Sequence, residues 1–313
     1  MTPLRDHGGG IDAAIAQFGG TRDEWLDLST GINPMPYTLP TFSQMDWATL
    51  PDKEQFKRLE HAARAFWNIP PEAAVLAGPG ASAFIARIPH LSVTRGAVHI
   101  IDETYNEHAA AFRAAGWCVE LGGKNASVTV HPNNPTASFV TESDIPQTPL
   151  TIIDESFCDI APDQSHIAKA AEAGTIILKS FGKFWGLAGL RLGFAIGDPA
   201  LIAELRETLG PWQVSGPALA TGIAALSDHN WAQETRARLR LDAQRMDDLM
   251  AAAGAKPKAG TTLFQIYEVD NAQQWQERFA SHKILTRIFP YSDKWLRLGL
   301  PASDRWPQLE AAL

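Results

Sequence analysis

TIILKSFGKFWGLAGLRLGF, residues 175–194, decides how this chain folds. Its apolar start, 175–178, leads directly into polar and glycine residues, which is typical of a buried strand where it leaves a parallel sheet. Ser180 and Lys183 stand at that exit, and Arg191 follows eight residues after the lysine. Ligand sites of open α/β sheets lie outside the carboxyl ends of the strands. The stretch therefore predicts a parallel sheet that presents an amine to a ligand.

Length and composition set the class of protein. With 313 residues, the chain is long enough for roughly two domains and for a core that encloses a site. It is 45% hydrophobic and 20% charged, which is typical of a globular rather than a disordered chain. The formal charge of -8 disfavours a sequence-wide basic surface for nucleic acid or anionic lipid. We therefore expect a small-molecule partner, with no nucleic acid and no membrane.

The cysteines and the chain start indicate the compartment. Cys118 and Cys158 are too few for a disulfide framework, and neither has a second cysteine at metal-site spacing. The N-terminal MTPLRDHGGG lacks the apolar segment of a signal peptide. No window approaches the roughly 18 unbroken apolar residues of a membrane helix. These features predict a cytoplasmic protein without a metal site.

The middle of the chain alternates short apolar runs with helical stretches, a pattern typical of a mostly parallel sheet covered by helices. Strands are expected at 73–77, 97–101, 127–130, 150–154, 175–179 and 193–196. Helices are expected to begin near Ala81, Asn106 and His166.

Beyond Pro211 the pattern changes. Apolar residues at helical spacing over 239–253 predict a long helix, for which Gly254 supplies a C-terminal stop. Strand-like runs, TTLFQIY and KWLRLGL, then flank a helix expected at 272–282. These elements predict a second, smaller domain.

The domain division expected from these patterns has three parts. Residues 1–45 form an N-terminal arm and part of the small domain, and residues 46–210 form the large domain. Residues 211–313 form an interdomain helix and the C-terminal small domain.

Three loops after strands carry groups that fit one cofactor. Asp154 ends the apolar run LTIID, as Ser180 ends its own strand. GPGAS, 78–82, follows a strand and precedes a helix, so its backbone N–H groups can hold a phosphate, to which Arg191 adds a bidentate contact. A phosphate site, an acid and Lys183 around one apolar slot favour pyridoxal phosphate. With that cofactor, a lysine bonds to the aldehyde and a carboxylate keeps the pyridine nitrogen protonated.

Four motifs, in this order, carry a family resemblance: HPNNPT at 131–136, DES at 154–156, SFGK at 180–183 and GLAGLRLGF at 186–194. With them the chain resembles, over nearly its whole length, the class I and II aminotransferase family of pyridoxal-phosphate enzymes. The resemblance implies an α/β fold: a mostly parallel seven-stranded sheet with helices on both faces, plus a smaller α+β domain. It also implies a homodimer whose active sites lie at the subunit interface.

The same resemblance assigns roles to single residues. It implies that Lys183 is the Schiff-base lysine, that Asp154 is the partner of the pyridine nitrogen, and that Tyr105 stacks on the ring; these three form the catalytic set. Asn134 would donate to the phenolate oxygen of the ring, and His108 would sit behind Asp154. The cofactor-binding residues that it implies are Gly80, Ala81, Ser82, Tyr105, Asn134, Asp154, Ser180, Lys183 and Arg191.

Motifs at both ends of the chain narrow the resemblance. HGGG at 7–10, LDLSTGINP at 26–34, LPD at 50–52 and WLRLGLP at 295–301 are similar to a branch that serves cobalamin biosynthesis. Its members decarboxylate O-phospho-L-threonine to (R)-1-amino-2-propanol phosphate. This resemblance implies that the substrate carboxylate binds Arg297, with His7, Asn33 and Arg287 near the substrate phosphate.

Five residues depart from the family pattern, and two of them, Pro79 and Ala137, stand where asparagine and glycine are usual. Phe157 stands where a tyrosine usually helps hold the phenolate oxygen, which agrees with the decarboxylase branch. Leu50 stands where many relatives carry a tyrosine that reaches the cofactor phosphate of the partner subunit, and Gly31 replaces an asparagine of the branch. Two alternatives therefore stay open. One is an aminotransferase acting on a phosphorylated amino compound such as histidinol phosphate, and the other is a non-catalytic partner in cobalamin assembly.

Overall fold

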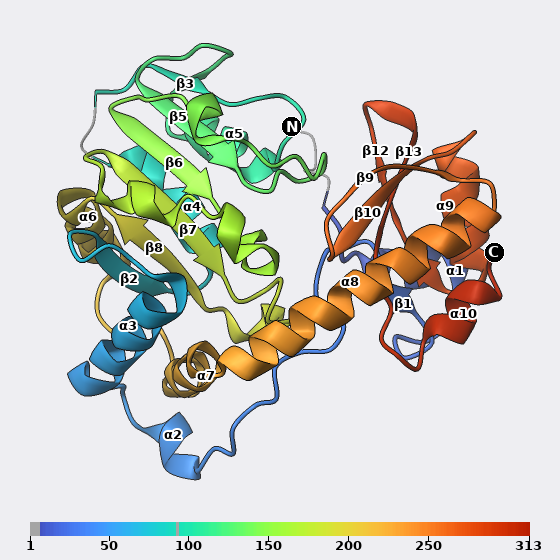
Figure 1. The fold of residues 1–313 in the computed structure, drawn as a ribbon, viewed down its shortest axis with the longest axis horizontal. Coiled ribbons are helices and arrows are strands. Elements are labelled where there is room, and N and C mark those ends of the chain that lie inside the picture. The colour runs from blue at the N-terminus through green and yellow to red at the C-terminus, as the bar shows by residue number, and fades with distance from the viewer. Residues whose placement is uncertain (1–6, 92–93) are drawn as a thin grey trace. The chain divides into compact units, whose positions relative to one another are not determined.

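The computed structural model describes residues 7–91 and 94–313 (Figure 1). The chain divides into two compact units. The larger comprises residues 37–134 and 138–233, and the smaller comprises 135–137, 234–313 and the described part of 1–36.

A seven-stranded sheet forms the centre of the larger unit, in the order β2-β8-β7-β6-β5-β3-β4. Its strands are β2 (Ala74–Gly78), β3 (Ala97–His99), β4 (Cys118–Val119), β5 (Ala126–Val130), β6 (Leu150–Asp154), β7 (Thr175–Ser180) and β8 (Gly193–Gly197). Strand β8 is antiparallel to both β2 and β7, whereas every pair from β7 to β4 is parallel. The predicted mostly parallel seven-stranded sheet is confirmed. The predicted strands lie within two residues of the observed bounds.

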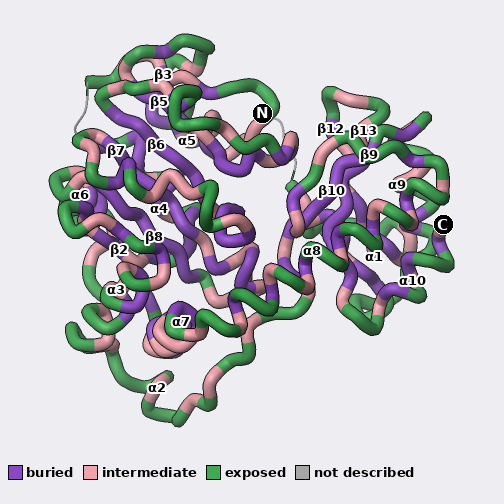
Figure 2. The backbone as a smooth tube through the Cα atoms, viewed as in Figure 1, coloured by how far each residue is buried: buried purple, intermediate pink, exposed green. Residues whose placement is uncertain are grey.

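Helices cover both faces of this sheet, as predicted. On one face, Ile152 and its neighbours join a core with α4 (Ala81–Arg87), α5 (Asn106–Ala114) and α6 (Pro199–Leu209). On the other face, the ring of Trp67 packs edge to face on Phe194 at 5.0 Å, and the helices are α3 (Lys53–Trp67) and α7 (Gly216–Ser227), which pack together. Figure 2 shows the central strands in the colour of buried residues, and every residue of β6 and β8 is buried. Because side chains alternate along a strand, Asp154 at the end of β6 and Glu155 beyond it are directed to opposite faces.

Local sequence explains where several of these helices begin and end. Asp52 caps α3 by accepting a hydrogen bond from the Gln55 N–H at 2.9 Å, and Asn68 ends it in the left-handed region. Ser215 caps α7 in the same way, through the Ala218 N–H. The short helix α2 (Gln44–Ala48) begins with a capping box.

The helix expected to begin near His166 begins at Ile167, but it is a short 3₁₀ helix, Ile167–Ala171, and not an α-helix. The His166 N–H, just before it, donates to Glu155 Oε1 at 2.5 Å. Just after it, Gly174 turns the chain with φ of +76° into β7.

The smaller unit is α+β, as predicted. Its antiparallel sheet has the order β12-β13-β10-β9, with β9 (Lys256–Gly260), β10 (Phe264–Glu268), β12 (Arg287–Phe289) and β13 (Ser292–Gly299). A parallel pair joins β1 (Leu26–Asp27) to β11 (Ile284–Leu285). The helices are α1 (Ile11–Phe18), most of α8 (His229–Ala252), α9 (Ala272–Ser281) and α10 (Trp306–Glu310). The sequence pattern did not predict strand β9. Its Pro257 is tolerated because β9 is an edge strand. Within the described residues, no helix has the length and apolarity needed to span a membrane.

Candidate cofactor site

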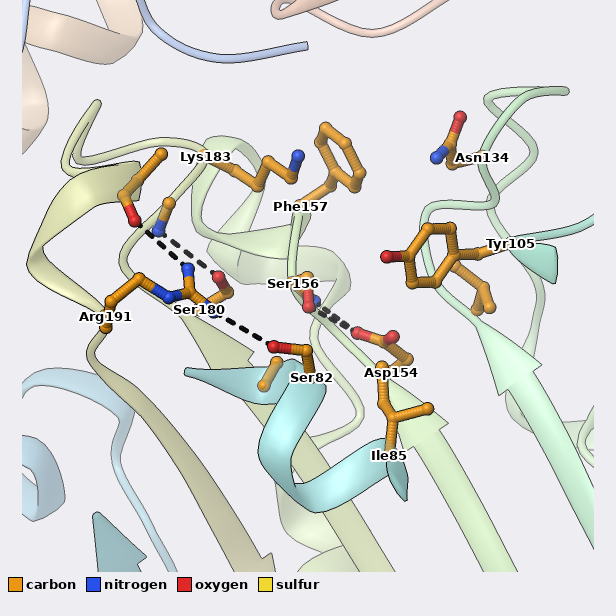
Figure 3. Close-up of a pocket in the computed structure, with 14 residues that line it drawn as sticks. Ser82, Ile85, Tyr105, Asn134, Asp154, Ser156, Phe157, Ser180, Lys183 and Arg191 are labelled. Carbon is orange, nitrogen blue, oxygen red and sulfur yellow. Dashed lines mark hydrogen bonds between the residues drawn. The ribbon is translucent and has the colours of Figure 1, made fainter. Parts of the chain in front are cut away.

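The larger unit contains a pocket at the carboxyl ends of β6 and β7 (Figure 3). Eight of the residues predicted for the cofactor line it: Ala81, Ser82, Tyr105, Asn134, Asp154, Ser180, Lys183 and Arg191. Gly80 lies next to the pocket and contacts Arg191. In Figure 3, Arg191, Ser180 and Ser82 lie on one side, and Tyr105 and Asn134 lie on the other. The topology thus brings together residues that are more than a hundred positions apart.

The side of the pocket with Arg191 suits an anion. Arg191 Nη2 donates to Ser82 Oγ at 2.9 Å, and Nη1 donates to the Ala188 carbonyl at 3.0 Å. A Cβ on Gly80 would lie 2.4 Å from Nη2, so only glycine lets the guanidinium approach the start of α4. No side chain caps α4. A guanidinium, the hydroxyl groups of Ser82 and Ser180, and the amides of a helix start fit the phosphate of pyridoxal phosphate.

Asp154 is a buried carboxylate that remains charged. Its Oδ1 accepts from the Ser156 N–H at 3.0 Å and from Ser156 Oγ at 2.5 Å, and its Oδ2 lies 2.8 Å from His108 Nε2. Burial raises the pKa of Asp154, but hydrogen bonds and charge from His108, with the Ser156 hydrogen bonds, outweigh it and hold the pKa below its usual value. A charged, buried carboxylate at the wall of the pocket is the group that a protonated pyridine nitrogen needs.

Lys183 lies on the turn that follows β7, with Nζ 5.1 Å from the centroid of the Phe157 ring. Phe181, Phe184 and Trp185 around it are completely buried and anchor the turn. The Lys183 amine therefore faces the ring of Phe157, at the position where a tyrosine would place a hydroxyl group. The Phe157 ring packs against the lysine but carries no hydrogen-bond donor.

Sequence reasoning missed two residues that organise this pocket. Ser156 supplies two of the hydrogen bonds to Asp154, although it was visible in the quoted DES motif. Asn133 accepts from Thr104 Oγ1 at 2.5 Å and donates from Nδ2 to the Glu103 carbonyl at 2.7 Å. It thereby ties the loop of Asn134 to the residues just before Tyr105, and the doubled asparagine in HPNNPT was its only signal.

The predicted substrate residues lie in the smaller unit. Arg287 on β12 and Arg297 on β13 are direct cross-strand neighbours. Arg297 is buried and donates from Nη2 to the Ser29 carbonyl at 2.7 Å, while Ser29 Oγ accepts from the Gly9 N–H at 2.7 Å. The HGGG segment and Arg297 therefore meet at Ser29, and His7 at the start of that segment is exposed.

Asn33 is the remaining residue predicted to bind the substrate, and it is buried away from solvent. Its Oδ1 accepts from Arg238 Nη2 at 2.7 Å and from the Met35 N–H at 3.0 Å. Arg238 also pairs with Asp242 at 2.9 Å. The sequence offered no signal for Arg238, which sets the orientation of the Asn33 amide from α8.

Comparison with known proteins places these features in context. Residues 125–312 match the family model for aminotransferase class I and II. The chain is 36% identical to a threonine-phosphate decarboxylase from Sinorhizobium sp., with 96% of this chain and 95% of that protein covered. It is 35% identical to a threonine-phosphate decarboxylase from Pseudomonas aeruginosa, with 99% and 97% covered.

Solved structures share the fold. A histidinol-phosphate aminotransferase from Sinorhizobium meliloti in complex with pyridoxal-5'-phosphate has a TM-score of 0.81 and 18% identity, with 100% of this chain and 96% of that chain covered. The L-threonine-O-3-phosphate decarboxylase from Porphyromonas gingivalis has a TM-score of 0.71 and 16% identity, with 91% and 97% covered.

Proposed function

The chain belongs to the class I and II aminotransferase family, and from this premise we propose that it is a pyridoxal-phosphate-dependent decarboxylase. Its substrate is O-phospho-L-threonine, and its products are carbon dioxide and (R)-1-amino-2-propanol phosphate, in cobalamin biosynthesis. The observation that carries this proposal is identity of 35–36% over nearly the full length of two threonine-phosphate decarboxylases. The pocket independently supports the cofactor, because Asp154, Lys183 and Arg191 line one cavity.

Different residues of the pocket are placed to hold different parts of the cofactor. Arg191, Ser82 and Ser180 would hold its phosphate, and Asp154 would keep the proton on its pyridine nitrogen. Tyr105 and Asn134 approach from the opposite side of the pocket. When bound, the cofactor supplies an electron sink for the bond that breaks at the substrate α-carbon.

Lys183 has two tasks. Its Nζ supplies the amine that holds the cofactor covalently, and it is the group that moves a proton beside the reacting carbon. Decarboxylation breaks the bond between the α-carbon and the carboxylate, and a proton takes the place of carbon dioxide on that carbon. The reaction therefore balances without any 2-oxoacid acceptor.

Substrate orientation selects the reaction. With the cofactor bound, the residues that hold the substrate would decide, by the orientation that they impose on it, whether the α-carbon loses carbon dioxide or a proton. We infer that Arg297 binds the carboxylate, and that Arg287, Asn33 and His7 serve the phosphate. A charged pair of neighbouring arginines, Arg287 and Arg297, matches a substrate with two anionic groups.

Assembly and location are parts of the same proposal. We expect a homodimer, as in the family, and a reducing cytoplasm, in which the free thiols of Cys118 and Cys158 are stable. Light scattering measures the mass, and a monomer would contradict the dimer. Leu50 is 67% exposed and is available to contact a partner subunit.

One other function has support from a specific observation. The chain is 25% identical to a histidinol-phosphate aminotransferase of Mesorhizobium japonicum, with 94% of this chain covered, which favours transamination of a phosphorylated amino compound as the second candidate.

To separate the decarboxylase from the aminotransferase, the protein loaded with pyridoxal phosphate is incubated with O-phospho-L-threonine, with and without 2-oxoglutarate. Carbon dioxide and amine released without the acceptor support the decarboxylase. Stoichiometric keto acid that depends on the acceptor supports the aminotransferase, and a stable complex with other cobalamin enzymes but no turnover supports an assembly role.

A further inference from the structure

Lys179, the other lysine of the stretch 175–194, has no part in the proposed reaction. It lies four residues before Lys183, but its side chain is on the opposite face of the sheet and only 2% exposed. Its Nζ donates to Glu155 Oε2 at 2.5 Å and lies 3.9 Å from Asp159 Oδ1. Burial lowers the pKa of Lys179, but the charges of Glu155 and Asp159 outweigh it and raise the pKa above its usual value. Lys179 therefore stays a cation and is no nucleophile.

Glu155 is held by several donors at once. Its Oε1 accepts from the His166 N–H at 2.5 Å, and its Oε2 accepts from Ser165 Oγ at 2.6 Å in addition to Lys179. Burial raises the pKa of Glu155, but Lys179 and these hydrogen bonds outweigh it and lower the pKa. Lys179 and Glu155 thus form a permanently charged pair.

Asp159 extends this pair toward two tryptophans. Its Oδ1 accepts from the indole N–H of Trp67 at 2.8 Å, and its Oδ2 accepts from the indole N–H of Trp185 at 3.0 Å. Trp67 ends helix α3, whereas Trp185 follows Lys183 by two residues. A single buried carboxylate therefore connects the charged pair to the turn that carries the catalytic lysine.

Aromatic rings enclose the indole of Trp185 on several sides. Phe181, at 5.2 Å and 13°, and Trp231, at 5.2 Å and 11°, stack on it. Three further rings pack against it at steeper angles: Tyr37, Phe66 and Phe184. The N–H is the only polar group of the indole, and its directional hydrogen bond to Asp159 Oδ2 at 3.0 Å fixes the direction in which that edge of the ring points.

We propose that Asp159, paired with Lys179, is a positioning residue for Lys183: through the indole of Trp185 it fixes the turn at 181–187 and so the place of the lysine Nζ. The inference rests on the proposed function, because it concerns the bond between Lys183 and the cofactor aldehyde. On this proposal, the buried cluster of Lys179, Glu155 and Asp159 sets the position of Lys183 Nζ, in addition to its part in the core.

The two tryptophans provide a matched pair of variants. Trp185→Phe and Trp67→Phe each remove one indole N–H from the same carboxylate and the same volume from the same core, so they should lower the thermal stability similarly. Each variant is titrated with pyridoxal phosphate, which bonds to a lysine, and with pyridoxamine phosphate, which binds without that bond. Equilibrium dialysis gives both dissociation constants, and absorbance follows the lysine-bound cofactor.

The expected result separates positioning from folding. Trp185→Phe should raise the dissociation constant for pyridoxal phosphate roughly tenfold, the effect of losing about one hydrogen bond, and leave that for pyridoxamine phosphate within about twofold. Trp67→Phe should leave both within about twofold. Equal losses for both ligands in both variants, or wild-type binding of pyridoxal phosphate by Trp185→Phe, would overturn the proposal.

Further variants cover the case in which a tryptophan substitution prevents folding. Asp159→Asn keeps the volume of the side chain. It loses the charge and one of the two oxygens that accept hydrogen bonds from the indoles, so it should weaken pyridoxal phosphate binding, and not pyridoxamine phosphate binding, as Trp185→Phe does. Lys179→Arg should preserve the binding of pyridoxal phosphate, and Lys179→Met should weaken it; equal binding by these two would count against the proposal.

If the wild-type protein gains no absorbance with pyridoxal phosphate, the proposed function fails and the inference fails with it. Wild-type absorbance together with an unaffected Trp185→Phe refutes the inference alone.

Discussion

On the two faces of β6 and β7, the same residue types do different things. Asp154 and Lys183 lie on the open face, at the cofactor pocket, while Glu155 and Lys179 lie on the closed face, behind it. Asp154 is held mainly by Ser156 and His108, and so its charge remains available to a ligand. Glu155 is neutralised by a cation at 2.5 Å. The partners of an acid or a lysine, more than its position in the sequence, therefore decide whether it takes part in chemistry.

The largest effect should come from the lysine on the open face. Lys183→Ala removes the amine that bonds to the cofactor and moves the proton, so turnover should fall by at least about 10³-fold. The absorbance of the lysine-bound cofactor should disappear. Unchanged absorbance would mean that a different lysine bonds to the cofactor.

The lysine on the closed face should affect stability instead. Lys179→Met leaves Glu155 and Asp159 buried without their cation, which should lower the free energy of unfolding by about 3–5 kcal/mol. Urea denaturation measures the loss. The double variant Glu155→Gln with Lys179→Met should recover part of it, because the uncompensated charge of Glu155 is gone. A double variant that is less stable than Lys179→Met would contradict this explanation.

Asp154→Asn tests the carboxylate of the open face with little change in volume. It removes the charge that holds a protonated pyridine nitrogen, so the affinity for cofactor should fall about 30-fold, as for a lost hydrogen bond to a charged group. Turnover should fall as well. Fluorescence titration with pyridoxal phosphate gives the affinity, and wild-type affinity and rate would refute the role of Asp154.

The smallest effect is the pH dependence of the closed face. The folded-state pKa of Glu155 lies below its usual 4.5, so this acid stabilises the fold above pH 4.5, and the contribution is lost as pH falls through the folded pKa. The folded-state pKa of Lys179 lies above its usual 10.5, so its contribution is present below pH 10.5 and is lost as pH rises through the folded pKa. The stability difference between wild type and the double variant should therefore be flat from about pH 5 to 10. Glu155 and Lys179 also act on the pKa of buried His131, so a slope near neutral pH that persists when His131 is replaced would show that the pair is not permanently charged.

Sequence patterns predicted one of these faces much better than the other. Apolar runs ending in Asp154 and Ser180 indicated two strand ends, and parallel strands bring such ends to one edge, so the pocket could be anticipated. The partners of Lys179 could not be anticipated in this way. Asp159, Trp67 and Trp185 come from three separate segments, and none of them carries a local signal for the others.

By itself, the sequence determined the order of the motifs, the alternating α/β pattern, and the presence of a lysine, an acid and an arginine at strand ends, because these follow from local periodicity and chain order. The sequence already indicated Lys183 as the lysine of the pocket, and the tertiary structure was needed to show which groups surround Lys179. Lys179 belongs to β7, and side-chain alternation directs it to the closed face, where packing of distant segments supplies its acids. Lys183 lies beyond the strand, on a turn whose buried aromatic residues direct it into the pocket.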